Sequence, residues 1–251
     1  MNTKLKLFLL LFFLGLLGIL SLLTIQIPMD SIPTEIAERF SPNELKMLTL
    51  INPMVLLIIA LIIGILLFDK VNLQLPLLFP ENDIEQSEKS FAETIKYGLF
   101  GGALSGSLIV CTGLLFQPYL PTEFNEASQK IELSIFARLL YGGITEELLL
   151  RFGVMTLAVW IVSKMTKALS PAVYWSGILI SSLLFALGHF PIVFQTVESP
   201  SSILLSYILL GNSVGGLIFG WLYWKQGLEA AIIAHMATHI VMMLGESLFT
   251  L

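Results

Sequence analysis

Three short motifs place ionisable side chains inside apolar stretches of this sequence. The first carries two adjacent carboxylates and an arginine, the second ends in a histidine, and the third carries two histidines. These residues are Glu146, Glu147, Arg151, His189, His235 and His239. An ionised side chain at the centre of a bilayer costs about 3 kcal/mol, so such residues mark contacts between helices or a functional site. All three histidines of the chain lie in these motifs, and that concentration favours a functional site.

Helical spacing indicates which of these side chains can meet. Glu147 and Arg151 are four residues apart, so they share a helical face and can form an ion pair. Glu146 lies about 100° further round the helix and is not neutralised by that pair. His235 and His239 are also four residues apart, so their imidazoles project toward one place. This spacing suits either metal ligation or hydrogen bonds to one substrate oxygen.

Hydrolysis of a peptide bond needs an activated water, donors for the oxyanion that develops, and a proton for the leaving amine. Glu146 and His189 could activate the water, while His235 and His239 could donate to the oxyanion. Alternatively, Glu146 and the three histidines could ligate zinc, which would activate a bound water. The sequence contains neither the H-E-x-x-H motif of common zinc proteases nor a G-x-S-x-G elbow. Zinc and a metal-free glutamate mechanism therefore both stay open.

Structural roles and two other functions compete with this interpretation. His189 alone could join helices by a hydrogen bond, and the pair of Glu147 and Arg151 could do so without chemistry. The protein could also be a non-catalytic membrane protein that binds a peptide or bacteriocin and confers immunity. A proton-coupled transporter is a third class, because carboxylates and imidazoles can relay protons. The absence of repeated halves in the sequence disfavours a transporter.

The composition is typical of a membrane protein. Of the 251 residues, 56% are hydrophobic and 12% are charged, which excludes an ordinary soluble enzyme. The net charge is -5 and no basic cluster is present, so nucleic acid is not an expected partner. We expect a lipid bilayer and a peptide instead. The single cysteine, Cys111, cannot form an intramolecular disulfide and is expected to be buried in an apolar stretch.

Seven apolar stretches are long enough to cross a bilayer core of about 30 Å. They run from Leu7 to Ile25, from Leu48 to Phe68, from Tyr97 to Phe116, from Ser134 to Val162, from Ala172 to His189, from Ile203 to Trp224 and from Leu228 to Leu248. The fourth is longer than one crossing needs, which predicts a tilted helix or two pieces broken near Gly153. The sequence therefore predicts an all-α, polytopic transmembrane bundle of about seven to eight spans.

The distribution of lysine and arginine between the loops predicts the orientation. One side of the spans carries Lys4, Lys6, Lys70, Lys89, Lys96, Lys164, Lys167 and Lys225, and the other carries Arg39, Lys46, Lys130 and Arg138. The positive-inside rule then places the amino terminus in the cytoplasm of a bacterial-type cell membrane, with the first stretch as a signal anchor. Glu229, at the start of the last stretch, is expected to be a surface carboxylate favoured by the helix dipole.

Distances from the turns predict how deep the motifs lie. Glu146 and His189 are 21 and 22 residues from the turn between their stretches, so the two should be level across a helical hairpin. His235 is only about 8 residues from the turn at Gly227. Either that turn is sunk into the membrane, or the stretch from Phe190 to Leu210 does not run straight across.

Taken together, the motifs resemble those of the CPBP family, the CAAX protease and bacteriocin-processing proteins, also called the abortive-infection family. The matching residues are Glu146-Glu147-x-x-x-Arg151, Phe185-x-x-x-His189 and His235-x-x-x-His239. The resemblance covers the chain from Ser134 to Leu248, and the set is specific in order and spacing. It implies an intramembrane protease, with N-terminal transmembrane helices and loops over residues 1–130 and the protease core over residues 131–251.

The resemblance also implies a role for each motif residue. Glu146 and His189 would activate the hydrolytic water, and the ion pair of the first motif would support the site. His235 and His239 would stabilise the oxyanion. Members of the family are described both as metalloproteases and as metal-independent glutamate proteases, so the resemblance leaves zinc an open question.

Two positions depart from the family pattern. In the family, asparagine or aspartate is common at the position of His239. The histidine of this chain keeps a hydrogen-bond donor there and makes a metal site easier to form. Glycine often follows the arginine directly, whereas Phe152 stands before Gly153 here. For a bacterial chain, the resemblance implies a peptide pheromone, a bacteriocin leader or a small membrane protein as substrate, rather than a prenylated CAAX protein.

Overall fold

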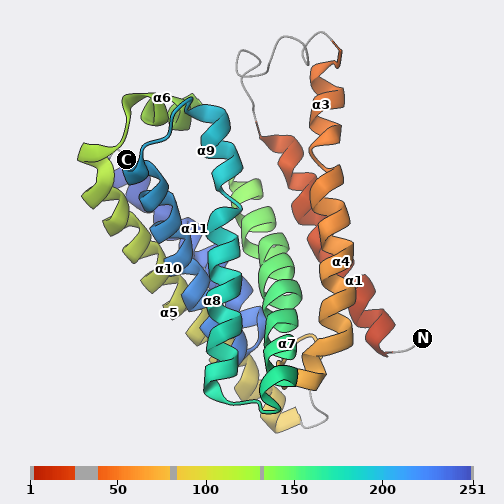
Figure 1. The fold of residues 1–251 in the computed structure, drawn as a ribbon. Coiled ribbons are helices and arrows are strands. Elements are labelled where there is room, and N and C mark those ends of the chain that lie inside the picture. The colour runs from red at the N-terminus through yellow and green to blue at the C-terminus, as the bar shows by residue number, and fades with distance from the viewer. Residues whose placement is uncertain (1–2, 26–38, 80–83, 131–132, 250–251) are drawn as a thin grey trace.

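The computed structural model describes residues 3–25, 39–79, 84–130 and 133–249. These residues form helices, and no strand occurs among them (Figure 1). The α-helices are α1 (Thr3–Ser21), α3 (Pro42–Leu48), α4 (Ile51–Leu67), α5 (Ile84–Phe116), α6 (Thr122–Lys130), α7 (Thr156–Thr166), α8 (Pro171–Leu187), α9 (Phe190–Thr196), α10 (Ser202–Gln226) and α11 (Leu228–Phe249). The predicted all-α architecture is confirmed.

Seven helical stretches of the described chain are long and apolar enough to cross a membrane. They are Thr3–Thr24, Pro42–Val71, Phe91–Tyr119, Ala137–Thr166, Pro171–Thr196, Ser202–Gln226 and Leu228–Phe249. The amino and carboxyl ends lie at opposite ends of the bundle, as an odd number of spans requires (Figure 1). Large apolar side chains such as Phe13, Leu115 and Leu179 are exposed on its outer surface, where a membrane protein contacts lipid.

The fourth span is one continuous helix with an unusual hydrogen-bond pattern. It opens with two π-helical segments, η5 (Ala137–Glu146) and η6 (Leu148–Met155), and continues as α7. Gly153 lies within η6, so the break considered at this residue does not occur. A π-helix bonds residue i to residue i+5, is rare, and occurs mostly as single-turn insertions, often at functional sites. The residues in the π-helical half of the span are therefore candidates for a functional site.

The first span packs tightly against this π-helical half. Thr145 donates a hydrogen bond from Oγ1 to the carbonyl oxygen of Gly15 over 2.9 Å. A Cβ atom at Gly18 would lie 2.5 Å from the carbonyl oxygen of Leu140, so only glycine allows the two backbones to approach this closely. The stretch expected to be a signal anchor is therefore also a packed member of the bundle.

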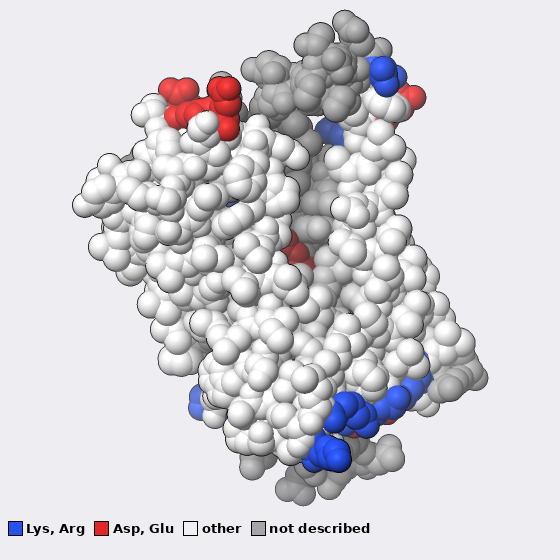
Figure 2. Space-filling view, viewed as in Figure 1, with Lys and Arg blue, Asp and Glu red and all other residues white. Residues whose placement is uncertain are grey.

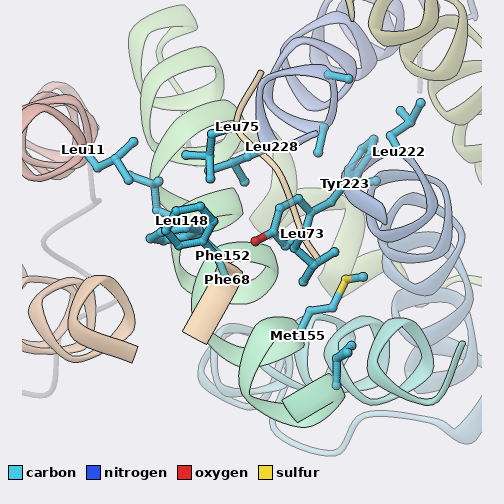
Figure 3. Close-up of a cluster of buried hydrophobic side chains, with 14 of the residues drawn as sticks. Leu11, Phe68, Leu73, Leu75, Leu148, Phe152, Met155, Leu222, Tyr223 and Leu228 are labelled. Carbon is cyan, nitrogen blue, oxygen red and sulfur yellow. The ribbon is translucent and has the colours of Figure 1, made fainter. Parts of the chain in front are cut away.

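The main hydrophobic core lies where the fourth span meets the link between α4 and α5. Figure 3 shows Leu148, Phe152 and Met155 of the fourth span near Leu73 and Leu75 of the link. The two link leucines are only 2% and 1% exposed, although they lie outside any helix. Lipid is as apolar as these side chains, so close packing and hydrogen bonds must hold the helices together.

The same link covers the start of α11. Gly227 has a φ of 96°, and a Cβ atom there would overlap Pro76. The backbone nitrogen of Leu228 donates to the carbonyl oxygen of Gln74 over 3.1 Å. The turn before α11 is therefore buried under the link, which explains why a histidine only two helical turns later lies deep in the bundle. The stretch 190–210 also does not run straight, because it divides between α9, a loop and α10.

Two expectations from the sequence are wrong. Glu229 is buried rather than at the surface, and its Oε1 accepts hydrogen bonds from the backbone nitrogens of Leu77 and Leu78 over 2.9 and 2.8 Å. This carboxylate joins the link to α11. The contact is between segments far apart in the sequence, so a local sequence pattern cannot predict it. Cys111 is exposed, because α5 presents that position on the outer surface of the bundle.

Charged side chains gather at the two ends of the molecule. Figure 2 shows lysine and arginine around the lower ends of α4 and α7, acidic side chains over α6 at the upper end, and a smaller group of basic and acidic side chains at the upper end near α3. The surface between them is almost free of charge on this face. These spans support an integral membrane protein. The cytoplasmic position of the amino terminus and the division of the chain at residue 130 stay predictions.

Candidate active site

The three motifs meet inside the bundle, although they lie on separate helices. Glu146 ends η5, Glu147 stands between η5 and η6, and Arg151 lies on η6. His189 stands at the junction of α8 and α9, and the other two histidines lie on α11. Carboxylates of the fourth span therefore face imidazoles from α11.

Glu147 is a fully buried carboxylate that holds two partners at once. Its Oε1 accepts a hydrogen bond from Nδ1 of His235 over 2.9 Å and lies 3.2 Å from NH1 of Arg151. The ion pair with Arg151 is the one that the i,i+4 spacing indicates, whereas the bond to His235 joins residues 88 positions apart. Because Glu147 fixes a proton on Nδ1, the other nitrogen of His235, Nε2, is left to face the remaining site.

Arg151 is held by aromatic rings in addition to its carboxylate. Its guanidinium carbon lies 5.0 Å from the ring centre of Phe185 and 5.3 Å from that of Phe219. The side chain is fully buried, and none of its nitrogens has a hydrogen bond of good geometry to a described residue. A desolvated cation over an aromatic face is stabilised by about 2 kcal/mol. The two rings thus help to retain the charge that neutralises Glu147.

Phe219 is a site residue that the sequence motifs do not contain. Its ring stacks on the imidazole of His235, with ring centres 4.5 Å apart and 24° between the planes. Phe219 lies on α10, and no fixed spacing connects it with a motif. The one signal is the pair Gly215 and Gly216 just before it, since small residues are typical of close helix packing.

Glu146 is the more accessible of the two carboxylates. Its side chain is 19% exposed, and its Oε2 lies 3.9 Å from Nε2 of His235. That distance is too long for a direct hydrogen bond. In Figure 2, acidic atoms are visible at the floor of a hollow between α8 and α4. Among the described residues no ion pair joins Glu146 to Arg151, and its carboxylate approaches His235 instead.

His189 is oriented by the backbone and by an aromatic ring. Its Nδ1 donates to the carbonyl oxygen of Phe185 over 2.9 Å, so Nε2 is free to accept a proton or a hydrogen bond. The imidazole meets the ring of Phe185 edge-on at 4.9 Å, and the same ring meets His235 at 5.7 Å. Phe185 therefore places both histidines in one layer of the bundle.

His239 has no hydrogen-bond partner among the described residues. Its ring stacks on His235 with centres 5.0 Å apart and 15° between the planes, and both of its nitrogens are buried. Nε2 lies against Gly142, where a Cβ atom would approach it to 2.5 Å. The ring is therefore a buried donor to which no described residue offers an acceptor.

The arrangement does not suit one metal ion bound by Glu146 and the three histidines. A ligating nitrogen directs its lone pair within the ring plane, with the metal about 2.1 Å away. The rings of His235 and His239 are nearly parallel and stacked, so one ion cannot lie in both planes. Nδ1 of His235 is also occupied by Glu147. Among the described residues, no group of three or more histidine, cysteine, aspartate or glutamate side chains is placed to hold a metal.

Comparison with known proteins identifies one relationship. The family model described as Rce1-like, type II CAAX prenyl endopeptidase Rce1-like, matches residues 128–241. This range contains all three motifs and ends two residues after His239. No curated protein and no solved structure matches the chain.

Proposed function

We propose, from the premise that residues 128–241 belong to the type II CAAX prenyl endopeptidase Rce1-like family, that this protein hydrolyses a peptide bond with water activated by Glu146 and His189. The family supports an intramembrane endopeptidase, and the reaction and the substrate are our proposal. One observation carries it most directly. Glu147 is buried and its Oε1 is engaged by two partners, whereas the adjacent Glu146 is more accessible and its Oε2 lies 3.9 Å from Nε2 of His235.

In the proposed reaction, a water beside Glu146 attacks the carbonyl carbon and gives its proton to the carboxylate. His189 orients this water, because its Nε2 can accept a hydrogen bond while Nδ1 is held by the backbone. The C–N bond then breaks as Glu146 returns the proton to the leaving nitrogen. Each residue therefore ends the cycle in the protonation state in which it began.

The oxyanion needs donors that have no other partner. His239 fits this requirement, because either tautomer presents an N–H and neither nitrogen is engaged by a described residue. His235 joins His239 as a donor when it is an imidazolium, because Glu147 keeps one proton on Nδ1 and a donor at Nε2 requires a second proton. Buried donors aimed at developing charge are effective because they need no reorganisation during the reaction.

We propose as substrate a membrane-associated peptide or small membrane protein, which reaches the accessible carboxylate from within the bilayer. A bacterial cell membrane with the amino terminus in the cytoplasm agrees with the lysine-rich end of the bundle. The apolar outer surface supports a lipid bilayer as the protein's surroundings.

The proposal is tested with detergent-purified protein and a library of apolar peptides, with cleavage sites read by mass spectrometry. Glu146→Gln should lower the cleavage rate by at least about a hundredfold, because a general base contributes this much. Glu126→Gln, at an exposed position of α6, is the matched control and should cleave like the parent. Binding of peptides by a parent that cleaves none of them would favour the non-catalytic immunity protein instead.

A further inference from the structure

Tyr141 on η5 carries a hydroxyl group that has no hydrogen-bond partner among the described residues. Two other tyrosines inside the bundle are partnered. Tyr174 donates from Oη to the carbonyl oxygen of Val71 over 2.9 Å, and the hydroxyl of Tyr223 lies 3.0 Å from that of Thr156. Tyr141 packs against the main core and is half-buried, yet no described residue bonds its Oη. A tyrosine hydroxyl inside a protein usually has a partner, so this one is available to a bound molecule.

Neighbouring helices cover η5 on two sides. On one side, α11 lies against Gly142 and Gly143, where added Cβ atoms would meet side chains of that helix. On the other side, α1 lies against the carbonyl oxygen of Leu140 and accepts the hydrogen bond of Thr145. A side chain of η5 that lies between these two faces is covered by neither helix.

Tyr141 and Glu146 share one strip of η5 between the two covered faces. They are five residues apart, and a π-helix bonds residue i to residue i+5, so they lie on adjacent turns of the same side. Both are partly exposed, whereas Gly142, Gly143 and Thr145 are buried. The phenol is close enough to the carboxylate for the two groups to interact electrostatically. Tyr141 therefore borders the place where Glu146 would activate a water.

His239 approaches Glu146 from the adjoining position. Its Nε2 lies against Gly142, which follows Tyr141 in the chain and stands four residues before Glu146. Positions four and five residues back are both neighbours on the preceding turn of a π-helix. The phenol and the imidazole thus bring two hydrogen-bond donors to the same side of the carboxylate, and neither has a partner among the described residues.

The neutral site otherwise offers the oxyanion a single donor. His235 donates from Nε2 only as an imidazolium, because its Nδ1 already donates to Glu147. His239 alone would then face the developing charge. A phenol keeps its proton at neutral pH, so Tyr141 can act as the second donor without adding a charge to the buried site.

We propose that Tyr141 is a further catalytic residue, whose phenol O–H donates beside His239 to the oxyanion that forms when water attacks the peptide carbonyl. The carbonyl oxygen becomes negative as the bond from the water oxygen to the carbonyl carbon forms. It returns to a carbonyl as the C–N bond breaks. Tyr141 keeps its proton throughout and contributes only a hydrogen bond. This inference rests on the proposed endopeptidase function.

The test compares Tyr141→Phe with the parent on a peptide that the parent cleaves. The substitution removes one oxygen and keeps the ring that packs against the core. We expect kcat to fall about a hundredfold or more, as for the loss of one oxyanion donor, with KM within about twofold of the parent. Tyr119→Phe, at a position that is 66% exposed, is the matched control and should cleave like the parent.

A transition-state analogue separates a catalytic hydroxyl from a structural one. The probe is the same peptide with a tetrahedral, anionic phosphinate in place of the scissile amide. Tyr141→Phe should bind it at least about tenfold more weakly than the parent does, and should keep the Tm of the parent because no hydrogen bond within the protein is lost. Unchanged phosphinate affinity, or a kcat within about threefold of the parent, would overturn the role of Tyr141.

Glu146→Gln in the same assay distinguishes this inference from the proposed function. Loss of cleavage in Glu146→Gln together with full cleavage by Tyr141→Phe would overturn the phenol donor and leave the endopeptidase intact. Failure of the parent to cleave any peptide would overturn the proposed function, and the catalytic role of Tyr141 with it.

Discussion

Nδ1 of His235 donates to Oε1 of Glu147 over 2.9 Å, and this bond joins α11 to the fourth span in the centre of the protein. Glu147 therefore serves two purposes. It neutralises Arg151 on its own helix, and it fixes the tautomer and ring orientation of a histidine that the sequence places 88 residues away. In the proposed reaction, the adjacent Glu146 activates the water.

Removal of Glu147 should destabilise the protein. Glu147→Ala leaves the guanidinium of Arg151 buried without a carboxylate, which costs about 3–5 kcal/mol when one member of a buried pair is removed. The unfolding free energy in detergent measures this loss. Glu126→Ala, at an exposed position, should change it by less than about 0.5 kcal/mol. Equal stability of the two variants would contradict the assignment of Glu147 as the central buried partner.

Phe219 should matter for the rate more than for substrate affinity. Phe219→Leu removes the ring that stacks on His235 and covers Arg151, so the imidazole loses its fixed orientation. We expect kcat to fall about ten- to a hundredfold with KM little changed, since small misplacement of catalytic groups costs this much. Phe194→Leu, an exposed position of α9, is the control. A purely structural role would lower the Tm and leave kcat of the folded fraction intact.

The contact between α1 and η5 should respond to the size of residue 18. Gly18→Leu places a side chain against the backbone of Leu140, and overpacking of this kind costs about 1–3 kcal/mol. Unfolding measurements should show this loss, together with reduced cleavage, because η5 carries Glu146. Leu17→Ala, whose side chain is exposed, should be close to neutral. If Gly18→Leu left the cleavage rate unchanged, α1 would not position the site.

Metal chelation should leave the activity unchanged. The stacked rings of His235 and His239 do not present their nitrogens to one ion, so the proposed reaction proceeds through the protein's own groups. The check is cleavage before and after dialysis against a chelator, with elemental analysis of the purified protein. A stoichiometric zinc ion that disappears in His239→Ala would show that these rings adopt another arrangement and ligate a metal.

The sequence alone determined the features that depend on neighbouring residues along one helix. Runs of apolar residues gave seven spans, because a bilayer of fixed thickness demands a minimum helix length. The i,i+4 spacing gave the pair of Glu147 and Arg151, because residues four apart share a face. The three motifs also gave the resemblance to CAAX proteases, and a family model of that kind matches residues 128–241.

Only the tertiary structure decided which helices meet. It brought Glu147 to His235, placed Phe219 on the same imidazole, and buried Glu229 under the link that covers the start of α11. It also decided that the fourth span continues through π-helical turns instead of breaking. In a membrane protein nearly every face of a helix is apolar, so hydrophobicity does not show which faces pair. Close approach at glycines and a few interhelical hydrogen bonds decide it, and these depend on residues far apart in the chain.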